Sequence, residues 1–128
     1  MRDIVHNIKV VNAVAPAVRS ASVDGDAIDL LGFDSVALAV TVGAVTAAGN
    51  MTVKLQESDE SGSGFTDVDP DHLQGAGLTN PLVTGSTTKV GYRGFKRYLR
   101  AVLTLNSGTS VSLGAIFILG NAAERPVA

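Results

Sequence analysis

The sequence predicts an all-β fold, a single-domain antiparallel β-sandwich or jelly roll that spans residues 1–128. Three observations predict it. Apolar and polar residues alternate with a period of two through most of the chain, as they do in strands with one buried face. Gly, Pro, Asn and Asp punctuate the chain at short intervals, and between them we count seven to nine short strands. The Ala-rich segments also contain Val, Thr and Gly, which weigh against helices.

The length and composition suit one folded domain. A chain of 128 residues is long enough for a single core. Hydrophobic residues make up 45% of it and charged residues 17%, a combination that excludes a disordered chain. Because a typical protein is about one quarter charged, we also expect more of this surface than usual to contact other proteins.

The N-terminal segment, residues 1–16, is too apolar for a free tail and includes Ile4, Val5 and Ile8. We expect residues 8–15 to form the first strand of the sandwich. The seven residues before this strand have two interpretations that the sequence leaves open. They either belong to the same domain or form an extended arm that adds to the sheet edge of a neighbouring subunit.

Four longer strands follow, and in each the apolar residues occupy alternate positions. The expected core faces are Val36, Leu38, Val40 and Val42; Met51, Val53 and Leu55; Leu99, Ala101, Leu103 and Leu105; and Val111, Leu113, Ala115, Phe117 and Leu119. Ile116 and Ile118 occupy the other face of the last of these strands. We therefore expect its second half to be buried on both sides.

The connections are predicted from their turn-forming residues. Asp24-Gly25 predicts a tight turn, and residues 106–109, Asn-Ser-Gly-Thr, predict a short hairpin. We expect a longer flexible connection over residues 43–50 and a long irregular segment over 69–85. Shorter strands are expected over 65–68 and 87–92. The last residues, 121–128, read as a tail with an extended Arg125-Pro126 step.

Residues that could perform catalysis are few. The only histidines, His6 and His72, accompany no nucleophile elbow, phosphate-binding loop, dinucleotide-binding turn or HExxH motif. The chain has no cysteine, which excludes disulfides and thiolate metal sites. We therefore expect no catalytic residue, no cofactor and no metal site, and we predict that the protein is not an enzyme.

Alternating aspartates beside His72 raise the question of a cation site. Asp67, Asp69 and Asp71 could supply the oxygen ligands that calcium prefers. Pro70 interrupts the spacing, however, and no glycine or glutamate follows at the positions an EF-hand requires. We favour a solvated loop whose aspartates form Asx-turns, and whether it binds an ion stays open.

A basic and aromatic cluster stands out between positions 89 and 100. It consists of Lys89, Arg93, Lys96, Arg97 and Arg100, interleaved with Tyr92, Phe95 and Tyr98. Such a cluster can bind single-stranded nucleic acid, remain a solvated surface, or form a protein interface or intramolecular salt bridges. We favour the last interpretation, because the net charge of −2 lacks the basic excess of nucleic-acid-binding proteins. For the same reason we predict no nucleic acid as a partner. We also predict no membrane partner, since no apolar run resembles a signal peptide or a membrane helix.

The predicted protein interface combines the N-terminal segment, the basic cluster and the tail. Its residues are Ile4, Val5, Ile8, Tyr92, Arg93, Phe95, Lys96, Arg97, Arg100, Arg125 and Pro126.

Several segments resemble a known group of proteins. These are Leu-Gln-Glu-Ser-Asp at 55–59 with Gly-Phe-Thr-Asp-Val at 64–68, and Lys-Val-Gly-Tyr at 89–92 with Lys-Arg-Tyr-Leu-Arg at 96–100. Together with the opening Met-Arg-Asp-Ile and the closing Glu-Arg-Pro-Val-Ala, they look like segments of small β-sandwich capsid decoration (cement) proteins of tailed bacteriophages and prophages. The resemblance spans most of the chain, and its motifs are structural and not catalytic.

The resemblance implies a structural virion protein, made in the host bacterial cytoplasm, that binds the outer surface of a phage capsid and stabilises contacts between capsomers. The implied partners are the major capsid protein and further copies of the chain, as a homodimer or homotrimer. A head–tail connector or a tail-tube component is the alternative. A carbohydrate-binding sandwich is a third hypothesis, which the absence of Trp and the presence of only two Tyr do not favour.

Overall fold

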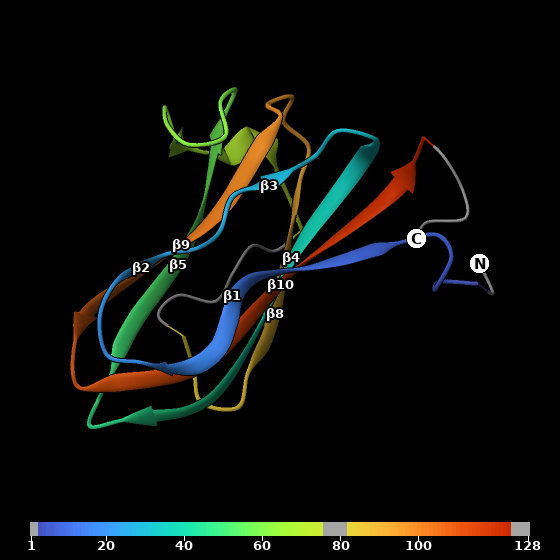
Figure 1. Ribbon diagram of the computed structural model, residues 1–128. Helices are drawn as coiled ribbons and strands as arrows, with labels where there is room; N and C mark the ends of the chain where they lie inside the picture. Colours follow the sequence, from blue (N-terminus) through green and yellow to red (C-terminus); the bar gives the residue numbers. More distant parts are fainter. Residues whose placement is uncertain (1–2, 76–81, 124–128) are drawn as a thin grey trace.

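The protein is a sandwich of two antiparallel sheets (Figure 1). The structure is a computed structural model that describes residues 3–75 and 82–123. In these residues the strands are β1 Lys9–Arg19, β2 Val23–Asp24, β3 Ile28–Asp29, β4 Phe33–Thr46, β5 Asn50–Ser58, β6 Thr66–Asp67, β7 Leu73–Gln74, β8 Thr87–Tyr92, β9 Tyr98–Ser107 and β10 Ser110–Ala122. The first sheet has the order β1-β10-β4-β8-β7, and the second has the order β2-β9-β5-β6 with β3 also paired to β9. The predicted fold class is confirmed.

The core lies between the two sheets and follows the predicted alternation. The expected inward residues of β4, β5 and β10 are buried, as are Leu99, Ala101 and Leu103 of β9, while Leu105 packs against the core at its edge. Phe117, Leu38, Met51 and Leu99 are among the largest side chains that are fully buried. Each sheet therefore turns one apolar face toward the other, as expected for a sandwich.

One short predicted strand and one predicted hairpin are confirmed in position, and another predicted connection is shorter than expected. β8 spans the predicted residues, and β9 and β10 are joined by a hairpin in which Gly108 adopts φ +81°. The expected flexible connection over 43–50 is wrong, because β4 continues to Thr46 and pairs there with Ser110 of β10. Ala47 and Ala48, at φ 50° and 58°, then close a tight turn. Positive φ at consecutive residues suits the twist of a hairpin.

The predicted tight turn at Asp24-Gly25 is also wrong. Gly25 lies in an extended crossing between β2 and β3, where its N–H donates to Ala101 O at 2.7 Å. A Cβ at Gly25 would lie 2.6 Å from Ala13 O and 2.7 Å from Ala101 O. The glycine is therefore required by the close approach of three backbone segments, one of the uses of a residue without a side chain.

The segment over 69–85 contains more regular structure than expected. A 3₁₀ turn spans Pro70–His72, and β7 follows it and pairs with β8. Asp69 Oδ1 accepts from the N–H of Asp71 at 3.0 Å, which is the Asx-turn that we predicted. Asp67 differs, because its carboxylate contacts Lys54 Nζ at 3.0 Å on the outer face of the second sheet.

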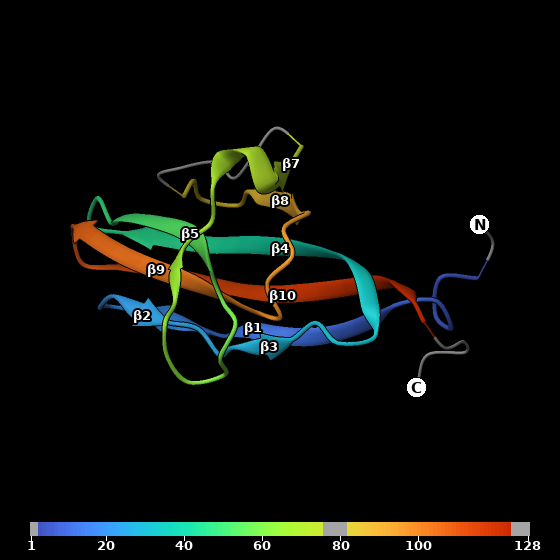
Figure 2. The same ribbon diagram turned by 90° about the horizontal axis from the view of Figure 1, so that it is seen from above.

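The start of β1 and the end of β10 lie at the same end of the sandwich, where Lys9 pairs with Leu119 (Figure 2). The first strand is confirmed, but it extends through Pro16 to Arg19 and pairs with β10 along an edge, where a proline that lacks an N–H is tolerated. Residues 4–7 form a turn outside both sheets, closed by the N–H of Asn7 donating to Ile4 O at 3.0 Å. The predicted tail is wrong for residues 121 and 122, because β10 continues to Ala122, which pairs with Phe33. Residues 124–128 of the predicted tail lie outside the described residues.

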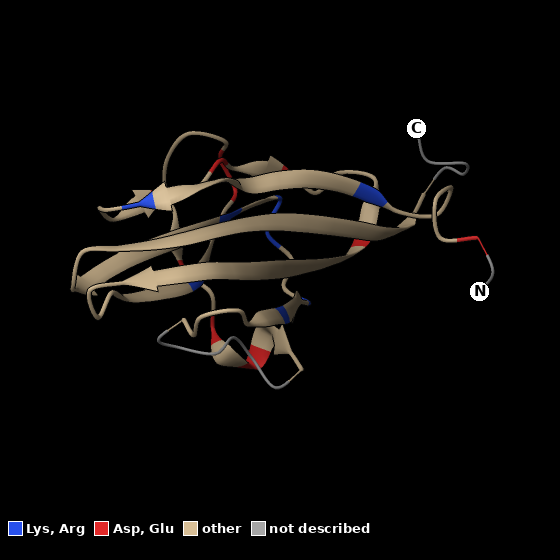
Figure 3. Cartoon of the chain, turned by 90° about the horizontal axis from the view of Figure 1, so that it is seen from below, with Lys and Arg blue, Asp and Glu red and all other residues tan. Residues whose placement is uncertain are grey.

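The outer face of the first sheet differs from the expectation for β10. Ile116 and Ile118 are half-buried on this face, and within the described residues no second layer of structure covers them. The expectation of burial on both sides is therefore wrong for the isolated chain. Figure 3 shows β10 without any charged segment along its length.

Candidate protein-binding surface

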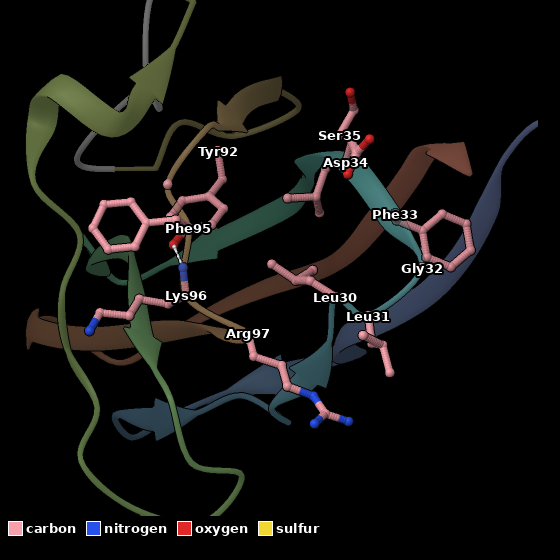
Figure 4. A pocket seen from close by; sticks show the side chains of 12 residues that line it. Leu30, Leu31, Gly32, Phe33, Asp34, Ser35, Tyr92, Phe95, Lys96 and Arg97 are labelled. Atoms are coloured by element: carbon pink, nitrogen blue, oxygen red, sulfur yellow. Dashed lines mark hydrogen bonds between the residues drawn. The ribbon is translucent and has the colours of Figure 1, made fainter. Parts of the chain in front are cut away.

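Two loops at one end of the sandwich enclose a hollow. One joins β3 to β4, the other joins β8 to β9, and they lie side by side because Val36 near the start of β4 pairs with Tyr92 at the end of β8. The hollow has a volume of about 480 Å³. Its lining is Leu30, Leu31, Gly32, Phe33, Asp34, Ser35, Val36, Tyr92, Gly94, Phe95, Lys96 and Arg97. In Figure 4, Leu30 extends into the space between the two loops.

Large apolar side chains are exposed on both loops. Phe95 is 80% exposed and Leu31 is 70% exposed. The ring of His72 packs edge-on against the Phe95 ring at 5.7 Å between centroids, and Lys96 Nζ lies 5.8 Å from the same ring. These contacts hold Phe95 from one side and leave the rest of its surface uncovered.

A backbone hydrogen bond joins the two loops, and an ion pair joins the second loop to the end of β3. Arg97 donates from Nε to Asp29 Oδ1 at 2.9 Å and from Nη2 to Asp29 Oδ2 at 2.8 Å, a bidentate pair. The N–H of Leu30 donates to Arg97 O at 2.8 Å. The hydrogen bond from Arg97 lowers the pKa of Asp29 below its ordinary value. The relative position of the two apolar loops is therefore held by directional contacts.

Beneath the hollow, a buried hydrogen bond joins the two sheets. Tyr92 of the first sheet is 3% exposed, and its hydroxyl donates to Glu57 Oε2 of the second sheet at 3.0 Å. The same hydroxyl oxygen accepts from the N–H of Lys96 at 3.2 Å. Burial is the main reason that the pKa of Tyr92 is raised to about 12, and the hydrogen bond to Glu57 acts in the same direction. Our placement of Tyr92 at a protein interface therefore differs from the structure, since its side chain belongs to the core.

The basic cluster is engaged largely within the chain. Lys96 Nζ contacts Asp59 Oδ2 at 2.8 Å, a hydrogen bond that raises the pKa of Lys96. Arg93 Nε donates to Asp71 O at 3.1 Å. The guanidinium of Arg100 donates to Gln56 Oε1 and lies 4.3 Å from the centroid of the Phe65 ring. From the sequence we favoured a protein interface or intramolecular salt bridges for this cluster, and the contacts seen here are intramolecular.

The N-terminal turn presents two further aliphatic residues at this end of the molecule. Val5 is 75% exposed and Ile4 is 55% exposed, whereas Ile8 is half-buried. The carboxylate of Asp3 accepts from the backbone N–H of His6 at 3.1 Å and contacts His6 Nδ1 at 2.8 Å. These hydrogen bonds from His6, first that from its backbone, lower the pKa of Asp3. The predicted interface residues Arg125 and Pro126 lie outside the described residues.

The sequence analysis did not identify the β3–β4 loop that lines the hollow, nor the buried Glu57 that binds Tyr92 beneath it. Leu30, Leu31 and Phe33 form an apolar run that does not alternate and that surrounds a glycine, a pattern that could have marked an exposed apolar loop. Gly32 adopts φ +92° there, a conformation that favours glycine. Glu57 occupies the next inward position after Leu55, and a carboxylate in an inward row is the signal of a buried polar contact.

Searches of the described residues for two other kinds of site found neither. No group of three or more His, Asp or Glu side chains there is arranged to hold a metal ion. No helix in the described part of the chain is long and apolar enough to cross a membrane.

Comparison with known proteins gives one similar structure and no similar sequence family. No protein-family model matches it, and no curated protein matches it. Among solved structures it is similar to one described as SPBc2 prophage-derived protein YomS, at 15% sequence identity and a TM-score of 0.47. That match covers 91% of this chain and 99% of the other. We rest the functional argument on the residues of this chain.

Proposed function

We propose that the protein is a structural component of a tailed-phage virion that binds the outer surface of the capsid and stabilises contacts between capsomers. The observation that supports this most is the pair of exposed apolar side chains, Leu31 and Phe95, on loops that a backbone hydrogen bond joins. The segments of the sequence that resemble decoration proteins support the identity of the partner, a major capsid protein.

The apolar end has the properties of a binding surface. Groups of exposed large apolar side chains often mark sites that a protein partner covers. Aromatic residues are enriched at the centres of protein interfaces. The backbone hydrogen bond from Leu30 to Arg97 and the ion pair of Arg97 with Asp29 form before a partner binds, which reduces the conformational entropy that is lost on binding.

Stabilisation of a shell by such a protein follows from mass action. A ligand that binds the assembled shell and not the free subunits shifts the equilibrium toward the shell. Many copies act on one particle, so each contact can be of modest area and affinity. The Leu31 and Phe95 surface would supply the apolar centre of that contact.

The test is co-sedimentation with capsids assembled, without this chain, from the major capsid protein encoded in the same gene cluster. We expect the wild type to sediment with the capsids and to raise their melting temperature. The double variant Leu31→Ser, Phe95→Ser should bind at least about 30-fold more weakly, since each central apolar anchor contributes on the order of 1–2 kcal/mol.

A matched control is Val83→Ser, because Val83 is also an exposed aliphatic residue, 53% exposed, but precedes β8 at the opposite end of that strand. The control should bind as the wild type does. Normal binding by the double variant would contradict the proposed surface. Rings or tubes formed by the purified protein alone in electron micrographs would instead support a head–tail connector or a tail-tube component.

A further inference from the structure

The outer face of the first sheet is unusual for a sandwich because it is almost without charge. Its outward positions on β1, β10, β4 and β8 carry aliphatic, small or hydroxyl side chains and Asn12, with Lys89 as the one charged residue among those described. The outer face of the second sheet is different, since Lys54 contacts Asp67 there and Arg100 approaches Asp24. Outward faces of antiparallel sheets are ordinarily polar, so the first sheet has the composition of a covered face.

The residues of this face are arranged in rows across the strands. One row, from β8 to β1, is Gly91, Ala37, Ile118 and Val10, and the next is Lys89, Ala39, Ile116 and Asn12. In both rows an isoleucine on β10 lies beside an alanine on β4. In a third row Thr41 on β4 pairs with Gly114 on β10, where the face is hollowed by a cavity of about 430 Å³.

We propose that this face binds the same face of a second copy of the chain, with a two-fold axis parallel to the strands and between β10 and β4. This operation lays β10 of one copy over β4 of the other, and β1 over β8. Ile116 then faces Ala39 of the second copy, and Ile118 faces Ala37. In a two-fold interface each of these contacts occurs twice, once in each direction.

The same operation matches the remaining positions by size and polarity. Val10 faces Gly91 of the second copy, where the Gln74 side chain of β7 lies beside the glycine, and Thr41 faces Gly114, where the ring of Pro16 does so. The charged Lys89 faces Asn12, whose amide oxygen can accept its hydrogen bond, and it does not face the other Lys89. Large side chains opposite small ones allow two aligned sheets to interdigitate at their usual separation.

The area of the face agrees with a stable dimer. With strands about 4.8 Å apart and a rise of about 3.4 Å per residue, four strands over roughly ten residues cover on the order of 650 Å² before side-chain relief is counted. A standard interface buries about 800 Å² on each partner. The proposed dimer does not depend on the proposed function, because the apolar end with Leu31 and Phe95 lies outside this face.

The first test is the mass of the purified full chain in solution, measured by light scattering or sedimentation. We expect the wild type to have twice the mass of the Ile118→Glu variant, which should be a 13.1 kDa monomer. Thr104→Glu is the matched control, since Thr104 belongs to β9 of the second sheet and pairs there with Thr52, and it should remain a dimer. Circular dichroism and a thermal melt show whether each variant is folded.

The second test exchanges a large and a small residue across the interface. Ile116→Ala and Ala39→Ile should each weaken the dimer at least about tenfold, and the double variant should recover to within about threefold of the wild type. A monomeric or trimeric wild type would refute the proposal. So would a folded Ile118→Glu variant that keeps the wild-type mass, or a double variant without recovery. Because no capsid is present, these results are separate from the test of capsid binding.

Discussion

The hydrogen bond between Tyr92 and Glu57 leads to a quantitative prediction about stability. Tyr92→Phe removes one hydroxyl and leaves Glu57, which is 8% exposed, without the donor that Oε2 has in the wild type. A hydrogen bond to a charged group contributes about 1.5–3 kcal/mol. We therefore expect the free energy of unfolding at pH 7 to fall by about 2 kcal/mol, measured by urea denaturation with an unchanged m-value.

The pH dependence provides an independent check of the same contact. The pKa of Tyr92 is raised from its ordinary value of 10 to about 12, first by burial. The unfolded chain therefore loses this proton near pH 10, while the folded chain retains it to about pH 12. The stability that the protonated hydroxyl contributes is fully present below pH 10 and is lost as the pH rises from 10 to about 12. At about 1.4 kcal/mol per unit over two units, this loss is on the order of 3 kcal/mol.

The assay is urea denaturation of the wild type and the Tyr92→Phe variant at steps between pH 8 and pH 11.5. The difference in stability between them should shrink above pH 10, because the variant has no hydroxyl to titrate at this position. Tyr98→Phe is the matched control, since Tyr98 is the only other tyrosine and its ring packs against Arg97. A pH-independent difference, or a Tyr92→Phe variant as stable as the wild type at pH 7, would refute the reasoning.

Two further predictions concern the core and one glycine. Phe117→Ala should lower the free energy of unfolding by about 3–5 kcal/mol in urea denaturation, because Phe117 is fully buried and its removal leaves a cavity between the sheets; a loss below about 1 kcal/mol would contradict its central position. Gly94→Ala should cost about 1–3 kcal/mol in thermal unfolding, because its Cβ would collide with the ring of Tyr92. Gly120→Ala is the control for a glycine with open space around its Cα, and equal losses in the two variants would count against the collision.

Much of the sandwich could be predicted because burial of alternate residues is a local property of a strand. The inward rows that contain Leu38, Met51 and Phe117 were identified from their spacing alone. The errors occurred where the backbone meets a distant segment. Gly25 resembles a turn residue in the sequence, but its absent side chain serves the approach of Ala13 and Ala101.

The candidate binding surface was harder to predict than the strands. Phe95 was expected at a surface and is exposed, whereas Tyr92, three residues earlier in the same basic cluster, is buried. Sequence spacing cannot distinguish them, because the inward direction of Tyr92 follows from its pairing with Val36 on β4. Leu31 lies at the same end of the sandwich as Phe95 because the pairing of β4 with β8 brings the β3–β4 loop beside the β8–β9 loop.

The amino-acid sequence by itself determined the all-β class, the residues of the core and the absence of disulfides, because these depend on composition and on a period of two along the chain. The tertiary structure decided which strands are neighbours, and therefore which side chains meet. The Tyr92–Glu57 bond, the Arg97–Asp29 pair and the uncharged rows across β10 and β4 all join residues far apart in sequence. Such contacts arise from the order of strands in the two sheets, and no local pattern encodes that order.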